Sequence, residues 1–299
     1  MDINIGQGVP TYSLSNAWFE TRPKDSPGMV DIDHMGLVEV VARIPALLEN
    51  LVGDDLQRSI TREYHRALRS YGHSFPAAVS LPRPCGERLP ERVVELLLAR
   101  LSYWPGALML DVGHANSMTC HRDMVRSLPA PRKITGIDMA EPVFDASQLY
   151  AESVRRDICD TGFADETFDL VWCISSLEHI GMDNSGYGES GSDGATAEGA
   201  LAEMLRITRA GGSILVTVPY GKRENHGWFR NFDLESLQDL LEAVRPLGAV
   251  HELYFAHSRG GGWGRTDAEE LKTTGYLDEG NAGAAGLAAV VIEKYAAWP

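Results

Sequence analysis

Short apolar runs alternate with amphipathic stretches over the last two thirds of the chain. ALMLDV and FDLVWCIS are examples, and runs of this length and composition are typical of strands buried on both faces of a sheet. Seven such runs are expected to form strands, at residues 107–112, 133–138, near 155, 168–175, 213–219, near 250 and 286–295. Helical periodicity separates some of them, most clearly at 196–210 and 233–244.

Strands that alternate with helices predict a parallel sheet with helices on both faces. Right-handed crossovers then produce a doubly wound fold, in which ligands bind at the carboxyl ends of the strands. We therefore expect an α/β domain over residues 105–299, with a doubly wound, seven-stranded, mostly parallel sheet.

The first hundred residues show only helical patterns. Residues 1–30 are polar and contain three prolines, which predicts an irregular lead-in. Helical spacing of apolar residues follows at 36–52, where Pro45 should divide the helix, and then at 54–72 and 91–104. We expect residues 1–104 to form an N-terminal helical extension that covers the active site or forms an oligomer surface.

Composition and charge restrict the possible partners. The chain has 299 residues, is 44% hydrophobic and carries a formal net charge of -15, with no cluster of Lys and Arg that could neutralise phosphates. No apolar run approaches the roughly 20 residues of a membrane span, and MDINIGQGVP lacks the pattern of a secretory signal. The four cysteines show no CxxC spacing. These features predict a cytoplasmic protein that binds neither nucleic acid nor membrane.

Acidic residues follow several of the expected strands. Asp111 and Gly113 end the first strand, and Asp138 ends the second, where a carboxylate can accept two ribose hydroxyls. Asp157 follows the third strand, where it could take an adenine amino group, and Ser175 follows the fourth. These positions predict a nucleoside site at one edge of the sheet.

The ordered segments LDVG, ITGID, RRDI, FDLVWCISSLEHI and RITRAGGSILVTVP resemble the class I S-adenosylmethionine-dependent methyltransferases over roughly residues 105–295. More narrowly, LEHIGMDNSGYG, VPYGKRENHGWFRNFD and RGGGWGR resemble a bacterial subgroup linked to sugar and natural-product biosynthesis. The resemblance implies S-adenosylmethionine as cofactor and a small-molecule acceptor. We assign no metal site, although some sugar O-methyltransferases of the wider family use a metal. The cofactor-binding residues that it implies are Asp111, Gly113, His114, Ala115, Asp138, Met139, Asp157, Ile158 and Ser175.

The first motif departs from the family pattern, which has three alternating glycines after the acidic residue. Here only Gly113 remains, while Ala115 and Ser117 are the smallest replacements and Asn116 tolerates a left-handed conformation. We expect a working cofactor loop; the alternative is a fold that has lost its cofactor and acts as a scaffold or regulatory protein. A dinucleotide-dependent oxidoreductase is disfavoured, because no GxGxxG turn follows the first strand.

Two histidines are candidate bases for the acceptor. His179 follows the fourth strand and histidine titrates in a useful range, although the same position could simply pack a helix start. His226, after the fifth strand, is the second candidate. The other substrate-side candidates are Glu178, Tyr187, Tyr220, Trp228 and Arg230.

Two glycine-rich segments are candidate lids. The segment 181–199 is expected to close over substrate; alternatively, Asp183, Asn184 and Asp193 could offer oxygen ligands to magnesium. The segment 258–265 is either a second lid that lines the site with Trp263 or a plain connector.

Overall fold

The computed structural model describes residues 53–70, 75–76, 79–129, 133–185, 194–280 and 283–296. All of these belong to the compact unit Val38–Pro299. The predicted lead-in and the predicted helix at 36–52 lie outside the described residues, as do Tyr187 and Asp193.

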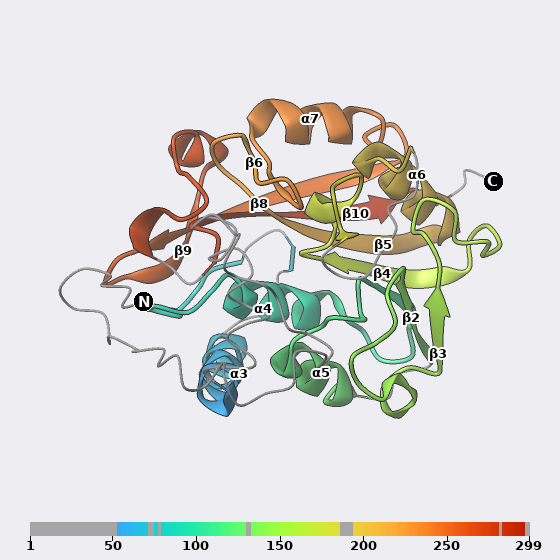
Figure 1. Cartoon of the computed structure of the whole chain (residues 1–299), viewed down its shortest axis with the longest axis horizontal. Helices are drawn as coiled ribbons and strands as arrows, with labels where there is room; N and C mark the ends of the chain where they lie inside the picture. Colours follow the sequence, from blue (N-terminus) through green and yellow to red (C-terminus); the bar gives the residue numbers. More distant parts are fainter. Residues whose placement is uncertain are drawn as a thin grey trace. The chain divides into compact units, whose positions relative to one another are not determined.

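One mixed sheet of eight strands organises the described chain, in the order β3-β2-β1-β4-β5-β10-β8-β9 (Figure 1). The four strand pairs from β3 to β5 are parallel, and the three pairs from β5 to β9 are antiparallel. Six strands therefore run in one direction, which confirms the mostly parallel α/β sheet. The strands are β1 (Leu108–Val112), β2 (Lys133–Asp138), β3 (Glu152–Arg155), β4 (Phe168–Ile174), β5 (Thr208–Pro219), β8 (Gly248–Ser258), β9 (Gly262–Thr266) and β10 (Gly286–Lys294).

The eighth strand corrects the predicted count of seven. It is β9, in the glycine-rich segment that was expected to be a lid or a connector. Trp263 is fully buried there, and its Nε1 donates a hydrogen bond to the carbonyl of Leu89 at 3.0 Å. Antiparallel pairing with β8 and this buried indole hold the strand at the sheet edge, so Trp263 belongs to the core and does not line a lid.

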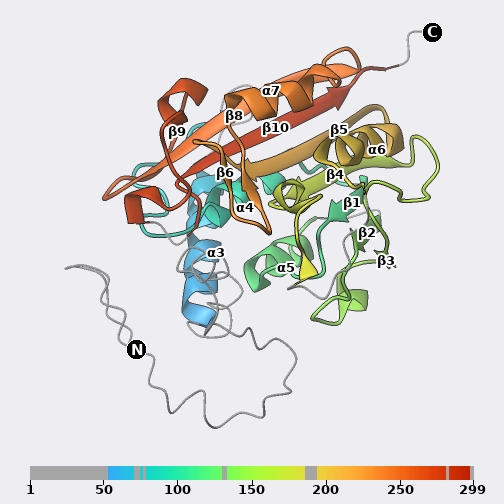
Figure 2. The same cartoon turned by 45° about the horizontal axis from the view of Figure 1, so that its top comes forward.

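Helices cover both faces of the sheet. α6 (Ala197–Ile207) and α7 (Leu234–Glu242) lie on one face, and α3 (Gly53–Arg69), α4 (Arg92–Ser102) and α5 (Thr119–Arg126) lie on the other (Figures 1 and 2). The short elements are η3 (Ala146–Gln148), η4 (Leu177–His179), η6 (Ala268–Leu271), η7 (Asp278–Gly280) and the hairpin of β6 (Glu224–Asn225) and β7 (Arg230–Asn231). No described helix has the length and apolar character that crossing a membrane requires.

α4 is largely buried: eight of its eleven residues are buried, the charged Glu95 among them. Leu97 and Leu98 share one apolar cluster with Met109 and Trp172 of the sheet. This helix therefore lies in the core beneath the sheet. The predicted division of the chain at residue 104 stays a prediction.

Candidate active site

The carboxyl ends of β1, β2, β3 and β4 meet at one edge of the sheet, because these four strands are neighbours and parallel. Gly113, Asp138, Asp157 and Ser175 all lie at or just after these ends. The structure thus brings together the strand-end positions that the sequence singled out.

Gly113 adopts a left-handed conformation with φ +80°, and its amide donates to the carbonyl of Ile137 at 2.9 Å. A Cβ at this position would lie 2.1 Å from Oγ of Ser176. The turn after β1 therefore needs glycine for two reasons, its backbone angle and the close approach of the loop after β4.

Asp138 links the loops after β1 and β2. Its two carboxylate oxygens accept hydrogen bonds from the amides of Ala115 and Ala140, each at 2.9 Å, and the side chain is half-buried. A carboxylate offers about four acceptor positions, so two amide bonds orient Asp138 and still leave capacity for ribose hydroxyls.

Asp111 and His114 direct their side chains into the protein. Oδ2 of the buried Asp111 accepts from Nε2 of His121 at 2.9 Å and from the hydroxyl of Tyr150 at 2.7 Å. Burial alone would raise the pKa of Asp111, but His121 and Tyr150 together lower it. His114 is also buried, with Nε2 2.7 Å from Oγ of Ser153. Both side chains support the loop from inside, and a direct role of either in holding cofactor stays a prediction.

The remaining cofactor-side candidates differ in exposure. Ala115 and Ile158 are buried, whereas Met139 and Asp157 are half-buried. Oδ1 of Asp157 accepts from the amide of Cys159 at 2.8 Å. Met139 and Asp157 are thus partly accessible at the ends of β2 and β3, where the sequence predicts the adenine.

His179, in η4, is the candidate base that lies at this edge of the sheet. Its Nδ1 is 2.9 Å from the carbonyl of Trp228, and a carbonyl can only accept, so Nδ1 carries the proton and Nε2 is the basic nitrogen. Burial lowers the pKa of His179 to about 4, against the effect of the bond to Trp228 and in line with the positive charge of Arg92. The ring is therefore neutral at pH 7, and 26% of the side chain is exposed.

Glu178 is the buried neighbour of this histidine. Its Oε1 is 4.0 Å from Nε2 of His179, and its Oε2 has no hydrogen-bond partner among the described residues. Burial raises the pKa of Glu178 well above its usual range. A carboxyl group in this setting holds its proton more strongly than a solvated one.

The hairpin of β6 and β7 lies against η4. Arg230 donates through Nη2 to the carbonyl of Ile180 at 2.5 Å, and the amide of Asp183 donates to the carbonyl of Gly227 at 3.2 Å. The rings of Trp228 and His179 have centroids 4.9 Å apart. The structure therefore groups three predicted residues, His179, Trp228 and Arg230.

His226 and Tyr220 occupy packed positions instead. His226 stacks on Phe229 with centroids 4.4 Å apart, and its Nε2 is 3.4 Å from a carboxylate oxygen of Glu224. Tyr220 is buried against Tyr254, and its hydroxyl has no hydrogen-bond partner among the described residues. These contacts favour packing roles for both residues, and their predicted catalytic and substrate roles have no direct support.

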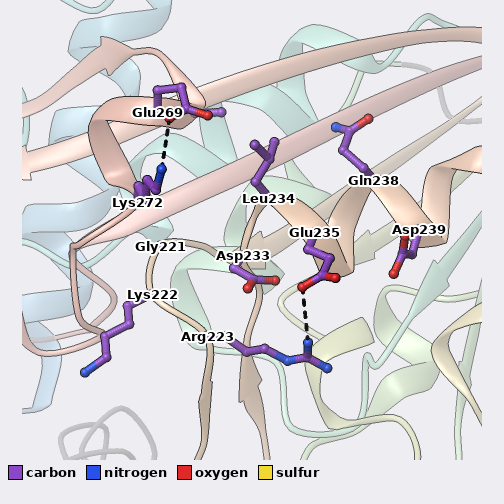
Figure 3. Close-up of a pocket in the computed structure, with 11 residues that line it drawn as sticks. Gly221, Lys222, Arg223, Asp233, Leu234, Glu235, Gln238, Asp239, Glu269 and Lys272 are labelled. Atoms are coloured by element: carbon purple, nitrogen blue, oxygen red, sulfur yellow. Dashed lines mark ion pairs between the residues drawn. The ribbon is translucent and has the colours of Figure 1, made fainter.

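A pocket of about 620 Å³ lies elsewhere, where the chain after β5 passes the start of α7 (Figure 3). Two ion pairs cross its lining, Arg223 with Glu235 at 4.0 Å and Lys272 with Glu269 at 3.7 Å. None of the predicted site residues lines this pocket.

In the part of the chain that the structure describes, no group of three or more His, Cys, Asp and Glu side chains is placed to hold a metal ion.

Two charged residues of α4 were missed by the sequence reasoning. Glu95 is fully buried and reaches Ser175, while Arg92 forms an ion pair with Glu95. The available signal was a Glu inside the apolar stretch VVELLLA, because a charged residue among buried apolar neighbours requires a buried partner.

Residues 110–216, which run from β1 to β5, match the family model described as a methyltransferase domain. The matched segment covers about a third of the chain and contains the strand ends described above. No curated protein matches the chain.

Several solved structures resemble this chain in fold. A 1,6-didemethyltoxoflavin-N1-methyltransferase from Burkholderia thailandensis, solved with bound 1,6-didemethyltoxoflavin and S-adenosylhomocysteine, is 12% identical, with 86% of each chain covered and a TM-score of 0.43. The N-methyltransferase NodS from Bradyrhizobium japonicum, solved with S-adenosylhomocysteine, is 16% identical over 81% of this chain and 99% of its own, with a TM-score of 0.42. These sequence identities and TM-scores are too low to assign the activity of either protein to this chain.

Proposed function

We propose that this chain transfers the methyl group of S-adenosylmethionine to a hydroxyl or amine of a small molecule, such as a sugar, an amino sugar or a natural-product intermediate. The observation that carries the proposal is His179, neutral and with Nε2 as its basic nitrogen, at the same sheet edge as Gly113 and Asp138. The net charge of -15 favours a neutral or cationic small acceptor over a polyanion.

The residues at the strand ends fit the cofactor. Asp138 would accept from the ribose hydroxyls, Met139 and Asp157 would border the adenine, and the turn at Gly113 would allow close backbone approach. The cofactor supplies an electrophilic methyl group on a positively charged sulfur. Holding donor and acceptor aligned removes much of the barrier of such a displacement.

His179 would act on the acceptor proton. As the acceptor oxygen bonds to the methyl carbon and the carbon–sulfur bond breaks to release S-adenosylhomocysteine, the hydroxyl proton would become strongly acidic, and Nε2 of His179 would take it. A neutral imidazole suits this role even with a pKa lowered to about 4, because the proton is transferred as the new bond forms. An amine acceptor needs only to arrive neutral.

Formation of S-adenosylhomocysteine with amino sugars and glycosides as acceptors tests the proposal. A general base contributes about 10²- to 10⁴-fold to the rate, so His179→Ala should lower turnover about a hundredfold or more while cofactor affinity changes little. His226→Ala is the matched control, since the packed His226 should affect stability more than turnover. Equal loss of turnover in both variants, or none in His179→Ala with a hydroxyl acceptor, would contradict the assignment.

A further inference from the structure

Glu95 connects α4 to the ends of two strands. Its Oε1 accepts hydrogen bonds from the hydroxyls of Ser175 at 2.5 Å and Thr217 at 2.8 Å. Its Oε2 forms an ion pair with Nη1 of Arg92 at 2.9 Å. Glu95 lies outside the matched segment 110–216, yet it is fully buried at the ends of β4 and β5.

Ser175 occupies a backbone conformation that a residue with a side chain rarely adopts, with φ +45°. Its amide donates to Oγ1 of Thr217 at 3.0 Å, so Ser175, Thr217 and Glu95 form a closed ring of hydrogen bonds. Such conformations persist where surrounding contacts hold them. The hydrogen bonds of Glu95 are contacts of this kind.

The conformation of Ser175 determines where the next residues lie. The carbonyl of Ser176 accepts from the amide of His179 at 3.2 Å, and its Oγ donates to the carbonyl of Ile174 at 3.1 Å. The same Oγ is the atom that a Cβ on Gly113 would meet. Ser175 therefore precedes a short segment that contacts the cofactor loop at one end and the base at the other.

We propose that Glu95 is a positioning residue of the active site: by holding Ser175 and Thr217, it sets the segment Ser175–His179 against the cofactor loop. This role in catalysis rests on the proposed function, because it requires that the chain binds S-adenosylmethionine and uses His179 as its base. It assigns α4 a role beyond core packing, and it accounts for the fully buried glutamate on this helix.

Variants of Glu95 and of its hydrogen-bond donors separate positioning from stability. Glu95→Ala removes all three contacts, whereas Glu95→Gln keeps an oxygen that can accept from both hydroxyls and loses the charge pairing with Arg92. Thr217→Val removes one donor with little change of shape. Glu63 is the matched control, because this α3 carboxylate also binds an arginine, Arg66, and accepts from the amide of Gly86 at 2.7 Å.

Three measurements on the full chain test the proposal. They are unfolding in urea, calorimetric titration with S-adenosylhomocysteine, and the NMR signal of the His179 ring without ligand, assigned with His179→Gln. We expect Glu95→Ala to weaken S-adenosylhomocysteine affinity at least tenfold and to shift the His179 signal. Glu95→Gln and Thr217→Val should show the same changes to a smaller extent, while Glu63→Ala lowers stability only.

The proposal is overturned if folded Glu95→Gln and Thr217→Val leave both the His179 signal and the affinity unchanged, or if Glu63→Ala changes them equally. Where Glu95→Ala does not fold, those two variants decide. If the unsubstituted protein does not bind S-adenosylhomocysteine, the proposed function is refuted. The positioning of His179 by Glu95 is still tested, because the NMR signal of His179 is measured without ligand.

Discussion

Replacing Gly113 by alanine tests the geometry of the cofactor loop. With φ +80°, an alanine here costs about 1–2 kcal/mol for its left-handed backbone. The added Cβ would lie 2.1 Å from Oγ and 2.9 Å from Cβ of Ser176, so that side chain must move. Overpacking of this kind costs about 1–3 kcal/mol. The expected loss in the free energy of unfolding is therefore about 2–5 kcal/mol, measured from urea transitions.

Alanine substitutions at two other glycines measure the backbone cost and the steric cost separately. Gly106 has φ +85° with nothing within 4 Å of an added Cβ, so Gly106→Ala should show the backbone cost alone, about 1–2 kcal/mol. At Gly136, outside the left-handed region, an added Cβ would lie 2.5 Å from Cδ2 of His114, so Gly136→Ala should show the steric cost alone, about 1–3 kcal/mol. If Gly113→Ala costs no more than Gly106→Ala, Ser176 does not approach the loop as described and the reasoning is refuted.

Three further predictions concern binding, the sheet edge and pH. Asp138→Ala should weaken S-adenosylhomocysteine affinity at least tenfold in calorimetry, because the carboxylate holds the amide of Ala115 and is the proposed acceptor for the ribose hydroxyls; unchanged affinity in a folded variant would remove the ribose assignment. Trp263→Ala should lower the free energy of unfolding by about 3–5 kcal/mol and leave cofactor affinity within twofold, because the indole is fully buried and donates to the carbonyl of Leu89; a selective loss of affinity would indicate that Trp263 lines the site. Burial, helped by the charge of Glu95, raises the pKa of Glu91 from 4.5 to about 7. The folded state then binds more protons than the unfolded state between these values, so this group makes stability fall as pH rises from about 4.5 to 7. Glu91→Gln should reduce that decline in urea unfolding at pH 5 and pH 8, and an identical decline in both proteins would show that Glu91 ionises normally.

The strands that the sequence predicted best are those buried on both faces. β4 and β5 are apolar runs at the centre of the sheet, whereas β3 is an exposed edge strand and gave only a weak pattern. β9 could not be recognised, because its glycines have low strand propensity and its stability comes from pairing with β8 and from Trp263. Pattern reasoning detects burial of consecutive residues, and it misses strands that are held by single long-range contacts.

The site was predictable in position and less so in orientation. Strand order places Asp138 and Gly113 at one edge, as the alternation of strands and helices implies. Position along the chain does not show that His114 turns inward to Ser153 or that His226 stacks on Phe229. Glu95 was missed for a related reason, since its partners Ser175 and Thr217 are more than 75 positions away along the chain.

Calorimetric titration of the full chain with S-adenosylhomocysteine, with and without EDTA, tests the central claim most directly. Binding in the micromolar range to a single site, unaffected by EDTA, is the predicted result, and it would establish that the loop after β1 works with one glycine. No detectable binding by the folded protein would contradict the account, and it would indicate a protein that keeps the methyltransferase fold without its cofactor.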